Sequence, residues 1–180
     1  MKRSDRDLAA PGLALAGGAL VAGAAVGGLV ARRRRRASTP TADAKLVARR
    51  VRQAPWTGEL DAIAELLSPD YVGHDPGEAE PIVGLAGLRT SVEPYVAAFP
   101  DGAVTIDAQF EERDTVVTQW TARGTHTGDL AGIAATGKEV TVSGVTVSRV
   151  EGGKIVEEWT SWDRLGLLVQ LDAVAEPARA

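Results

Sequence analysis

The spacing of apolar residues changes once along this chain, from a helical period to the period of a strand. Between residues 43 and 99 apolar residues recur every three or four positions, and beyond Asp101 and Gly102 they alternate with polar residues. Helices followed by consecutive antiparallel strands predict an α+β domain with one curved, antiparallel-rich sheet. The predicted helices span residues 43–55, 58–67, 85–99 and 164–174, and the predicted strands span residues 103–112, 115–126, 139–150 and 154–163.

Alternation within the strands predicts which side chains share a face. In the strand 115–126, Trp120 and His126 fall on one face and Arg123 falls on the other. Alternation alone does not decide which of these two faces points into the domain. The strand 103–112 alternates in the same way, and its apolar positions are Val104, Ile106, Ala108 and Phe110.

An uncharged run precedes the domain. Residues 8–31 contain no ionisable side chain and are rich in Ala, Gly, Leu and Val. As a helix this run would be about 36 Å long, enough to cross a hydrocarbon core about 30 Å thick. We therefore predict a short tail over residues 1–7 and a transmembrane anchor over residues 8–31. The alternative is secretion through a cleaved signal peptide, because Lys2, Arg3 and Arg6 precede the run.

Five arginines, Arg32, Arg33, Arg34, Arg35 and Arg36, follow the uncharged run directly. Because arginine-rich flanks stay on the cytoplasmic side, this pattern predicts a single-pass protein with a cytoplasmic C-terminal domain. The same arginines would attract anionic lipid headgroups at about 1 kcal/mol each. Residues 32–42 then form a basic flank and linker ahead of a domain over residues 43–175.

Composition narrows the possible functions. The net charge is -4 and no aromatic residue is interleaved with the arginine run, so we expect no nucleic-acid partner. The chain has no cysteine, which excludes disulfides, zinc-thiolate sites and cysteine nucleophiles. The histidines and carboxylates match no recognised metal-binding spacing, and we expect neither a metal nor a cofactor.

Three stretches carry a family resemblance: "ELLSPDYVGHDP", "GLAGLRTSVEPYVAAFPD" and "WTARGTHTGDLAGIAATGKEVTVSGVTVSRVEGGKIVEEWTSWDRLGLLVQL". Together they resemble the SnoaL-like polyketide (ester) cyclases of the nuclear transport factor 2-like superfamily, over roughly residues 43–173. The resemblance implies a cone in which three N-terminal helices cover the concave face of the sheet and enclose one apolar pocket. It also implies that the face with Trp120 and His126 points into this pocket and that Arg123 points outward or into a dimer contact. A homodimer formed through the sheet is implied as well.

The chain departs from the family at its best-understood catalytic positions. The resemblance implies an aspartate on the last strand and a glutamine and a histidine on the strand before it. Here those positions hold Thr160, Gly144 and Thr146, none of which moves a proton at neutral pH. The family's usual mechanism therefore does not transfer to this chain.

Other residues of the expected pocket carry the candidate chemistry. His74, His126 and Glu158 are the candidate catalytic residues, and we expect Glu158 within hydrogen-bond reach of one histidine, where the pair would exchange protons near neutral pH. Each histidine also has a structural interpretation, in a turn for His74 and at a strand end for His126. The candidate substrate-binding residues are Trp120, Trp162, Tyr71, Val142, Thr146 and Thr160.

Two classes of function remain open at this stage. The first is cofactor-independent acid-base chemistry of the cyclase, isomerase or lyase type on a small hydrophobic molecule. The second is a non-catalytic module that binds a small hydrophobic ligand. A membrane-tethered dimerisation domain is a further alternative.

Overall fold

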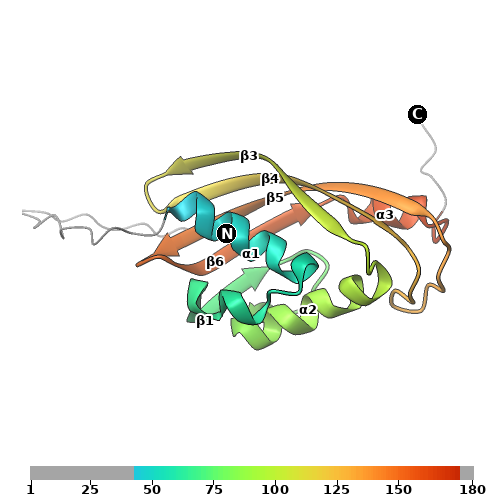
Figure 1. Cartoon of the computed structure of the whole chain (residues 1–180), viewed down its shortest axis with the longest axis horizontal. Coiled ribbons are helices and arrows are strands. Elements are labelled where there is room, and N and C mark those ends of the chain that lie inside the picture. The colour runs from blue at the N-terminus through green and yellow to red at the C-terminus, as the bar shows by residue number, and fades with distance from the viewer. Residues whose placement is uncertain (1–42, 175–180) are drawn as a thin grey trace, which may run out of the picture. The chain divides into compact units, whose positions relative to one another are not determined.

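The computed structural model describes residues 43–174, in which α1 and α2 lie on one side of a six-stranded sheet (Figure 1). The strand order is β2-β1-β6-β5-β4-β3; β1 and β6 run parallel and the other neighbours antiparallel. The predicted α+β fold is thus confirmed, with one parallel pair in the sheet. The elements are α1 (Ala44–Thr57), the 3₁₀ helix η1 (Asp61–Leu66), β1 (Leu67–His74), β2 (Ile82–Val83), α2 (Gly84–Ala98), β3 (Ala103–Glu112), β4 (Thr115–Thr125), β5 (Glu139–Glu151), β6 (Lys154–Trp162) and α3 (Arg164–Gln170).

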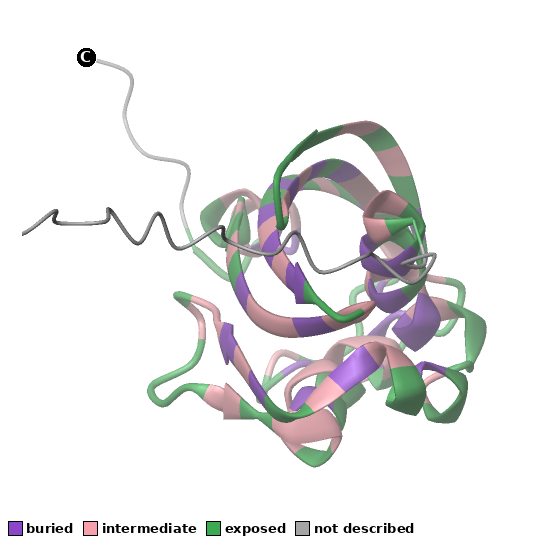
Figure 2. Ribbon diagram, turned by 90° about the vertical axis from the view of Figure 1, so that its left-hand side faces the viewer, coloured by how far each residue is buried: buried purple, intermediate pink, exposed green. Residues whose placement is uncertain are grey.

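The sheet is strongly curved when seen from its end (Figure 2). Helix α1 packs on β3 and β4, and α2 packs on β1, so both helices cover the concave face. Buried and exposed positions alternate along the strands because one face is covered and the other is open (Figure 2). The concave face is therefore the place where a cavity can form.

Local sequence signals set both ends of α1. The side chain of Asp43 accepts a hydrogen bond from the Lys45 N–H at 3.0 Å, which caps the first turn. Gly58 ends the helix in the left-handed conformation, with φ of 72°. The predicted end at Pro55 is two residues too early, because a proline in the last turn does not prevent the remaining residues from completing that turn.

The second predicted helix, over residues 58–67, is the least accurate part of the sequence prediction. The structure has the short η1 there, and the chain then enters β1, which the pattern did not predict. β1 pairs in parallel with β6, far away in sequence, and its register shifts between Leu67 and Val72. That irregularity accommodates Pro69, which cannot donate to a regular ladder.

A bulge in β3 corrects the predicted alternation of that strand. Ile106 pairs with Trp120 but Ala108 pairs with Gln119, so Asp107 is an extra residue. The bulge turns Ala108 and Phe110 to the convex face, away from Val104 and Ile106, and Phe110 is 66% exposed.

Two apolar clusters form the core. One joins α1, η1, β1 and β6 around Ile63, Tyr71 and Ile155, and the other joins α3 to the end of α2 around Phe99, Val140 and Leu167. Both clusters contribute side chains to a cavity on the concave face. The core thus surrounds the site and fixes its walls.

No helix within residues 43–174 has the length and apolar character needed to cross a membrane. The predicted tail, anchor and arginine flank, residues 1–42, lie outside the described residues, as do residues 175–180.

Candidate active site

The cavity lies between α1, α2 and the concave face of the sheet and has a volume of about 140 Å³. Its walls are mainly apolar and aromatic, as in most small-molecule sites. Trp120 from β4, Trp162 from β6 and Phe99 after α2 are among the aromatic residues of the wall. Gly144 of β5 faces the Trp120 ring, which fills the space where a side chain would stand.

Glu158 brings a carboxylate to this apolar cavity. Its side chain is 4% exposed, and two buried hydroxyls donate to it: Tyr71 Oη to Oε2 at 3.0 Å and Ser148 Oγ to Oε1 at 2.6 Å. Burial, then the negative charge of Glu158, raises the pKa of Tyr71 far above its ordinary value of 10.0, and the positive charge of Arg52 opposes that rise. Tyr71 therefore keeps its proton and donates a hydrogen bond to the carboxylate.

Arg52 from α1 is the second charged group at the cavity. One Nη2–H donates to Thr160 Oγ1 at 3.1 Å, and the guanidinium lies 5.3 Å from the centre of the Trp120 ring. The Trp120 Nε1–H donates to Thr146 Oγ1 at 3.1 Å, and Thr146 and Thr160 share a hydrogen bond at 3.2 Å. A continuous hydrogen-bonded chain therefore links β4, β5, β6 and α1 behind the cavity wall.

A third polar group, Asp75, lies where Trp162 meets α2. The Trp162 Nε1–H lies 3.1 Å from Oδ2 and 3.3 Å from Oδ1 of Asp75, and the Gly77 N–H donates to Oδ1 at 2.7 Å. Tyr95 packs edge-on against Trp162, and burial raises its pKa while the positive charge of Arg164 opposes that rise. Asp75 thus fixes the orientation of the Trp162 ring.

The structure places His74 on the convex face of the sheet, outside the cavity. It is the last residue of β1 and pairs with Trp159, whereas its neighbour Gly73 pairs with Glu158. Because successive residues of a strand point to opposite faces, His74 and Glu158 lie on opposite sides of the sheet. The expected position of His74 in the pocket is wrong because the sequence pattern did not reveal β1.

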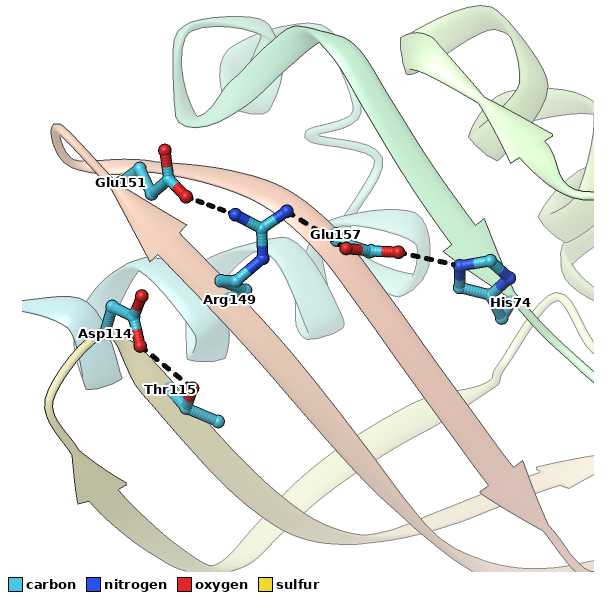
Figure 3. Close-up of polar contacts among 6 residues, drawn as sticks. All are labelled: His74, Asp114, Thr115, Arg149, Glu151 and Glu157. Atoms are coloured by element: carbon cyan, nitrogen blue, oxygen red, sulfur yellow. Dashed lines mark hydrogen bonds and ion pairs between the residues drawn. The ribbon is translucent and has the colours of Figure 1, made fainter. Parts of the chain in front are cut away.

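The partners of His74 form a surface network across β1, β6 and β5 (Figure 3). His74 Nε2 lies 3.0 Å from Glu157 Oε1, and the imidazole stacks on Trp159 with ring centres 5.5 Å apart. Arg149 donates to Glu157 Oε2 at 3.0 Å and also pairs with Glu151 (Figure 3). The hydrogen bond with His74, followed by that from Arg149, holds the pKa of Glu157 below its ordinary value.

His126 is fully buried but is not among the residues that line the cavity. Its ring lies 5.1 Å from that of Phe99, and its Nδ1 accepts the Thr136 N–H at 3.2 Å. Its backbone bonds to Lys138 and Gly137, so the residue closes the loop between β4 and β5. The expected contact with Glu158 is therefore wrong: β4 ends at Thr125, and strand alternation no longer determines where His126 points.

Four of the six candidate substrate-binding residues, Trp120, Trp162, Val142 and Thr160, line the cavity. Tyr71 and Thr146 lie behind the wall. The Tyr71 hydroxyl donates a hydrogen bond to the lining residue Glu158, and the Thr146 hydroxyl accepts one from the lining residue Trp120. Sequence reasoning missed Arg52, Ser148 and Asp75. Arg52 directly follows Val51 at the edge of the buried stripe of α1, a position that does not by itself distinguish a cavity from solvent.

Comparison with known families agrees with this architecture. A sequence model described as SnoaL-like polyketide cyclase matches residues 45–171, which is most of the chain. The chain belongs to the SnoaL-like polyketide cyclase family. No curated protein sequence is similar enough to count as a match.

Solved structures of the family are similar to the chain in fold and sequence. IdmH from Streptomyces antibioticus, a proposed polyketide cyclase, is 32% identical, with a TM-score of 0.64 over 72% of this chain and 99% of its own. A proposed polyketide cyclase from Acidithiobacillus ferrooxidans is 31% identical, with a TM-score of 0.65 over 77% and 100%. AclR from Streptomyces galilaeus, a proposed hydroxylase, is 28% identical, with a TM-score of 0.67 over 77% and 87%.

Proposed function

We propose that this SnoaL-like domain carries out cofactor-independent acid-base chemistry, of the cyclase or isomerase type, on a small hydrophobic carbonyl compound. Glu158 is the proton acceptor in this proposal. The observation that supports it is a buried carboxylate at the wall of an apolar cavity, held by the Tyr71 and Ser148 hydroxyls. A carboxylate has about four lone-pair directions. The two hydroxyls occupy two of them, and either of the other two can accept a proton from a substrate.

The Tyr71 and Ser148 hydroxyls position Glu158 for this proton transfer. They fix the carboxylate at the cavity wall, so the proton acceptor is held in place for the reaction. Desolvation by the apolar walls keeps competing water away from the reacting groups. The family supplies the reaction class, but the fold alone does not decide the reaction, since the structural relatives bear names of different activities.

An exchange assay tests proton transfer without knowledge of the natural substrate. The protein is incubated with 2-tetralone in D₂O, and loss of the α-proton signals is followed by ¹H NMR. We expect Glu158→Gln to lower the exchange rate by about 10²- to 10⁴-fold while 2-tetralone still binds. Glu157→Gln is the matched control, because Glu157 is the neighbouring carboxylate on the convex face, and it should exchange at the wild-type rate.

The second candidate function is a binding module that holds a hydrophobic ligand without chemistry. It is favoured by the positions of His74 and His126, neither of which supplies a proton-transfer partner at the cavity. If wild-type protein binds 2-tetralone but exchanges its α-protons no faster than the Glu158→Gln variant, this second function replaces the first. Mass spectrometry of small molecules that co-purify with the full-length chain would then identify the ligand.

We also propose that residues 8–31 anchor the protein in a membrane, with Arg32, Arg33, Arg34, Arg35 and Arg36 at the cytoplasmic headgroups. This proposal rests on the sequence alone. The alternative of a cleaved signal peptide predicts a mature protein that lacks residues 1–31. Mass spectrometry of the intact purified protein distinguishes the two.

A homodimer through the convex face is a further proposal. Phe110, Val117, Val147 and Trp159 lie in register across β3, β4, β5 and β6 on that face. Phe110 is 66% and Trp159 is 42% exposed, and a two-fold interface would bury this row against its own copy. Sedimentation of the wild-type protein against a Phe110→Asp, Trp159→Asp double variant tests it, and a dimer in both would contradict it.

A further inference from the structure

We propose that Arg52 and Thr160 form a two-donor subsite that binds an anionic or strongly polarised oxygen of the ligand. The subsite deepens the proposed function and in that sense rests on it, because it names the chemical group that the cavity would select. The ligand class is a compound with an enolisable carbonyl, or its enolate, next to an apolar body.

Arg52 has more donors than the described structure uses. A guanidinium carries five N–H donors, and here one donates to Thr160 Oγ1 at 3.1 Å. Arg52 Nε is buried without a hydrogen-bond partner, and Arg52 forms no ion pair with residues 43–174. A partly buried cation without a carboxylate partner is costly unless another oxygen completes its shell. The ligand is the group placed to do so, because Arg52 lines the cavity.

The hydroxyl proton of Thr160 is also free for a ligand. Thr146 and Thr160 share one hydrogen bond in which either hydroxyl could donate. Thr146 is 1% exposed and already accepts the Trp120 indole N–H, so the arrangement that gives its own buried proton an acceptor is the one in which Thr146 donates to Thr160 Oγ1. Thr160 Oγ1 then accepts from Thr146 and from Arg52, which fills both of its lone pairs. In this arrangement the Thr160 proton has no acceptor within the described part of the chain, and Thr160 lines the cavity. The network therefore presents the Thr160 hydroxyl as a donor.

The position of the subsite relative to Glu158 identifies the ligand class. Glu158 and Thr160 lie two residues apart on the same face of β6, which is about 6.6 Å along a strand. A molecule between them places an oxygen at the donors and a neighbouring C–H at the carboxylate. Removal of that proton moves the C–H electron pair into the carbonyl, and the resulting enolate oxygen is the group that two donors stabilise most.

A stable phenolate serves as the probe for this subsite. The full-length protein in lipid nanodiscs is titrated with 4-nitrophenol, whose anion absorbs in the visible, and with neutral 4-nitrotoluene, with empty nanodiscs as the blank. Wild-type protein should bind 4-nitrophenolate more tightly than 4-nitrotoluene. Arg52→Met should weaken phenolate binding about tenfold or more, and Thr160→Val about two- to tenfold, with 4-nitrotoluene affinity unchanged within about a factor of two. The unchanged affinity for the neutral probe shows that the cavity is intact.

Matched variants make the result decisive. Arg50 lies on the same helix as Arg52 but is exposed and does not line the cavity, so Arg50→Gln should leave the phenolate preference unchanged. Arg52→Lys keeps the positive charge but replaces the planar guanidinium and its fixed donors with an ammonium group, and it should weaken phenolate binding severalfold. If Arg52→Met fails to bind 4-nitrotoluene, the Arg52→Lys and Thr160→Val variants decide the question. A wild-type phenolate preference that persists in both variants, or no preference in the wild type, overturns the subsite.

The binding assay also separates this inference from the proposed function. Glu158→Gln removes a negative charge beside the phenolate and should strengthen its binding. If the wild-type protein shows the phenolate preference but no α-proton exchange, the subsite stands and the catalytic proposal fails. If α-proton exchange depends on Glu158 while phenolate binding ignores Arg52 and Thr160, the catalytic proposal stands and the subsite fails.

Discussion

Replacing Tyr71 with phenylalanine tests the hydroxyl support of Glu158. Tyr71 is 2% exposed and its hydroxyl lies 3.0 Å from Glu158 Oε2, so the change removes one donor while the ring keeps its packing. A hydrogen bond to a charged group contributes about 1.5–3 kcal/mol, and burial prevents water from replacing it. We expect the free energy of unfolding to fall by about 2 kcal/mol, roughly a 30-fold change in the folding equilibrium.

Tyr95→Phe is the matched control for this prediction. Tyr95 also lies against the cavity, but its hydroxyl has no hydrogen-bond partner within residues 43–174, so its removal should cost less than about 0.5 kcal/mol. Urea unfolding of a fragment of residues 38–180, followed by tryptophan fluorescence, measures both variants, with an unchanged m-value as the test of a common unfolding transition. Equal losses in the two variants, or no loss in Tyr71→Phe, would refute the reasoning.

Three other expectations concern separate parts of the chain. The pKa of Glu157 is held below its ordinary value of 4.5, so the contribution of Glu157 to stability is complete above pH 4.5 and is lost as the pH falls through the pKa of the folded state. The melting temperature of Glu157→Gln should therefore fall less on acidification than that of the wild type. Gly144→Ala places a methyl group against the Trp120 ring, and calorimetry should show a loss of about 1–3 kcal/mol together with weaker 2-tetralone binding. Deletion of residues 1–36 should move the protein from the membrane fraction to the soluble fraction as a folded domain with a cooperative thermal unfolding transition, and an unfolded fragment would show that the domain boundary is misplaced.

The sequence predicted the antiparallel part of the fold well because its signals are local. The strand over residues 103–112 was predicted with the observed limits, and the next three strands agree within one residue at each end. Period-2 alternation and hairpin turns depend only on neighbouring residues. The same alternation grouped the side chains of each strand by face, and the family resemblance then correctly placed Trp120 on the concave face.

The missed features depend on contacts between distant residues. β1 forms because it pairs in parallel with β6, and no local pattern in residues 67–74 indicates that pairing. The misplacement of His74 follows from this, since a residue assigned to a loop has no predictable face. The bulge at Asp107 is likewise a property of the β3 and β4 pairing. Arg52 was missed because a helical arginine beside an apolar stripe looks the same whether it faces solvent or a cavity.

Stereochemistry of proton exchange tests the central claim most directly. A single carboxylate on one wall of the cavity reaches one face of a bound ketone, so it should remove one of the two prochiral protons at a given α-carbon of 2-tetralone. We predict that wild-type protein incorporates the first deuterium at one prochiral position, and that Glu158→Gln abolishes this selectivity together with the rate. Equal incorporation at both positions, or selective exchange that survives in Glu158→Gln, would contradict the assignment of Glu158 as the proton acceptor.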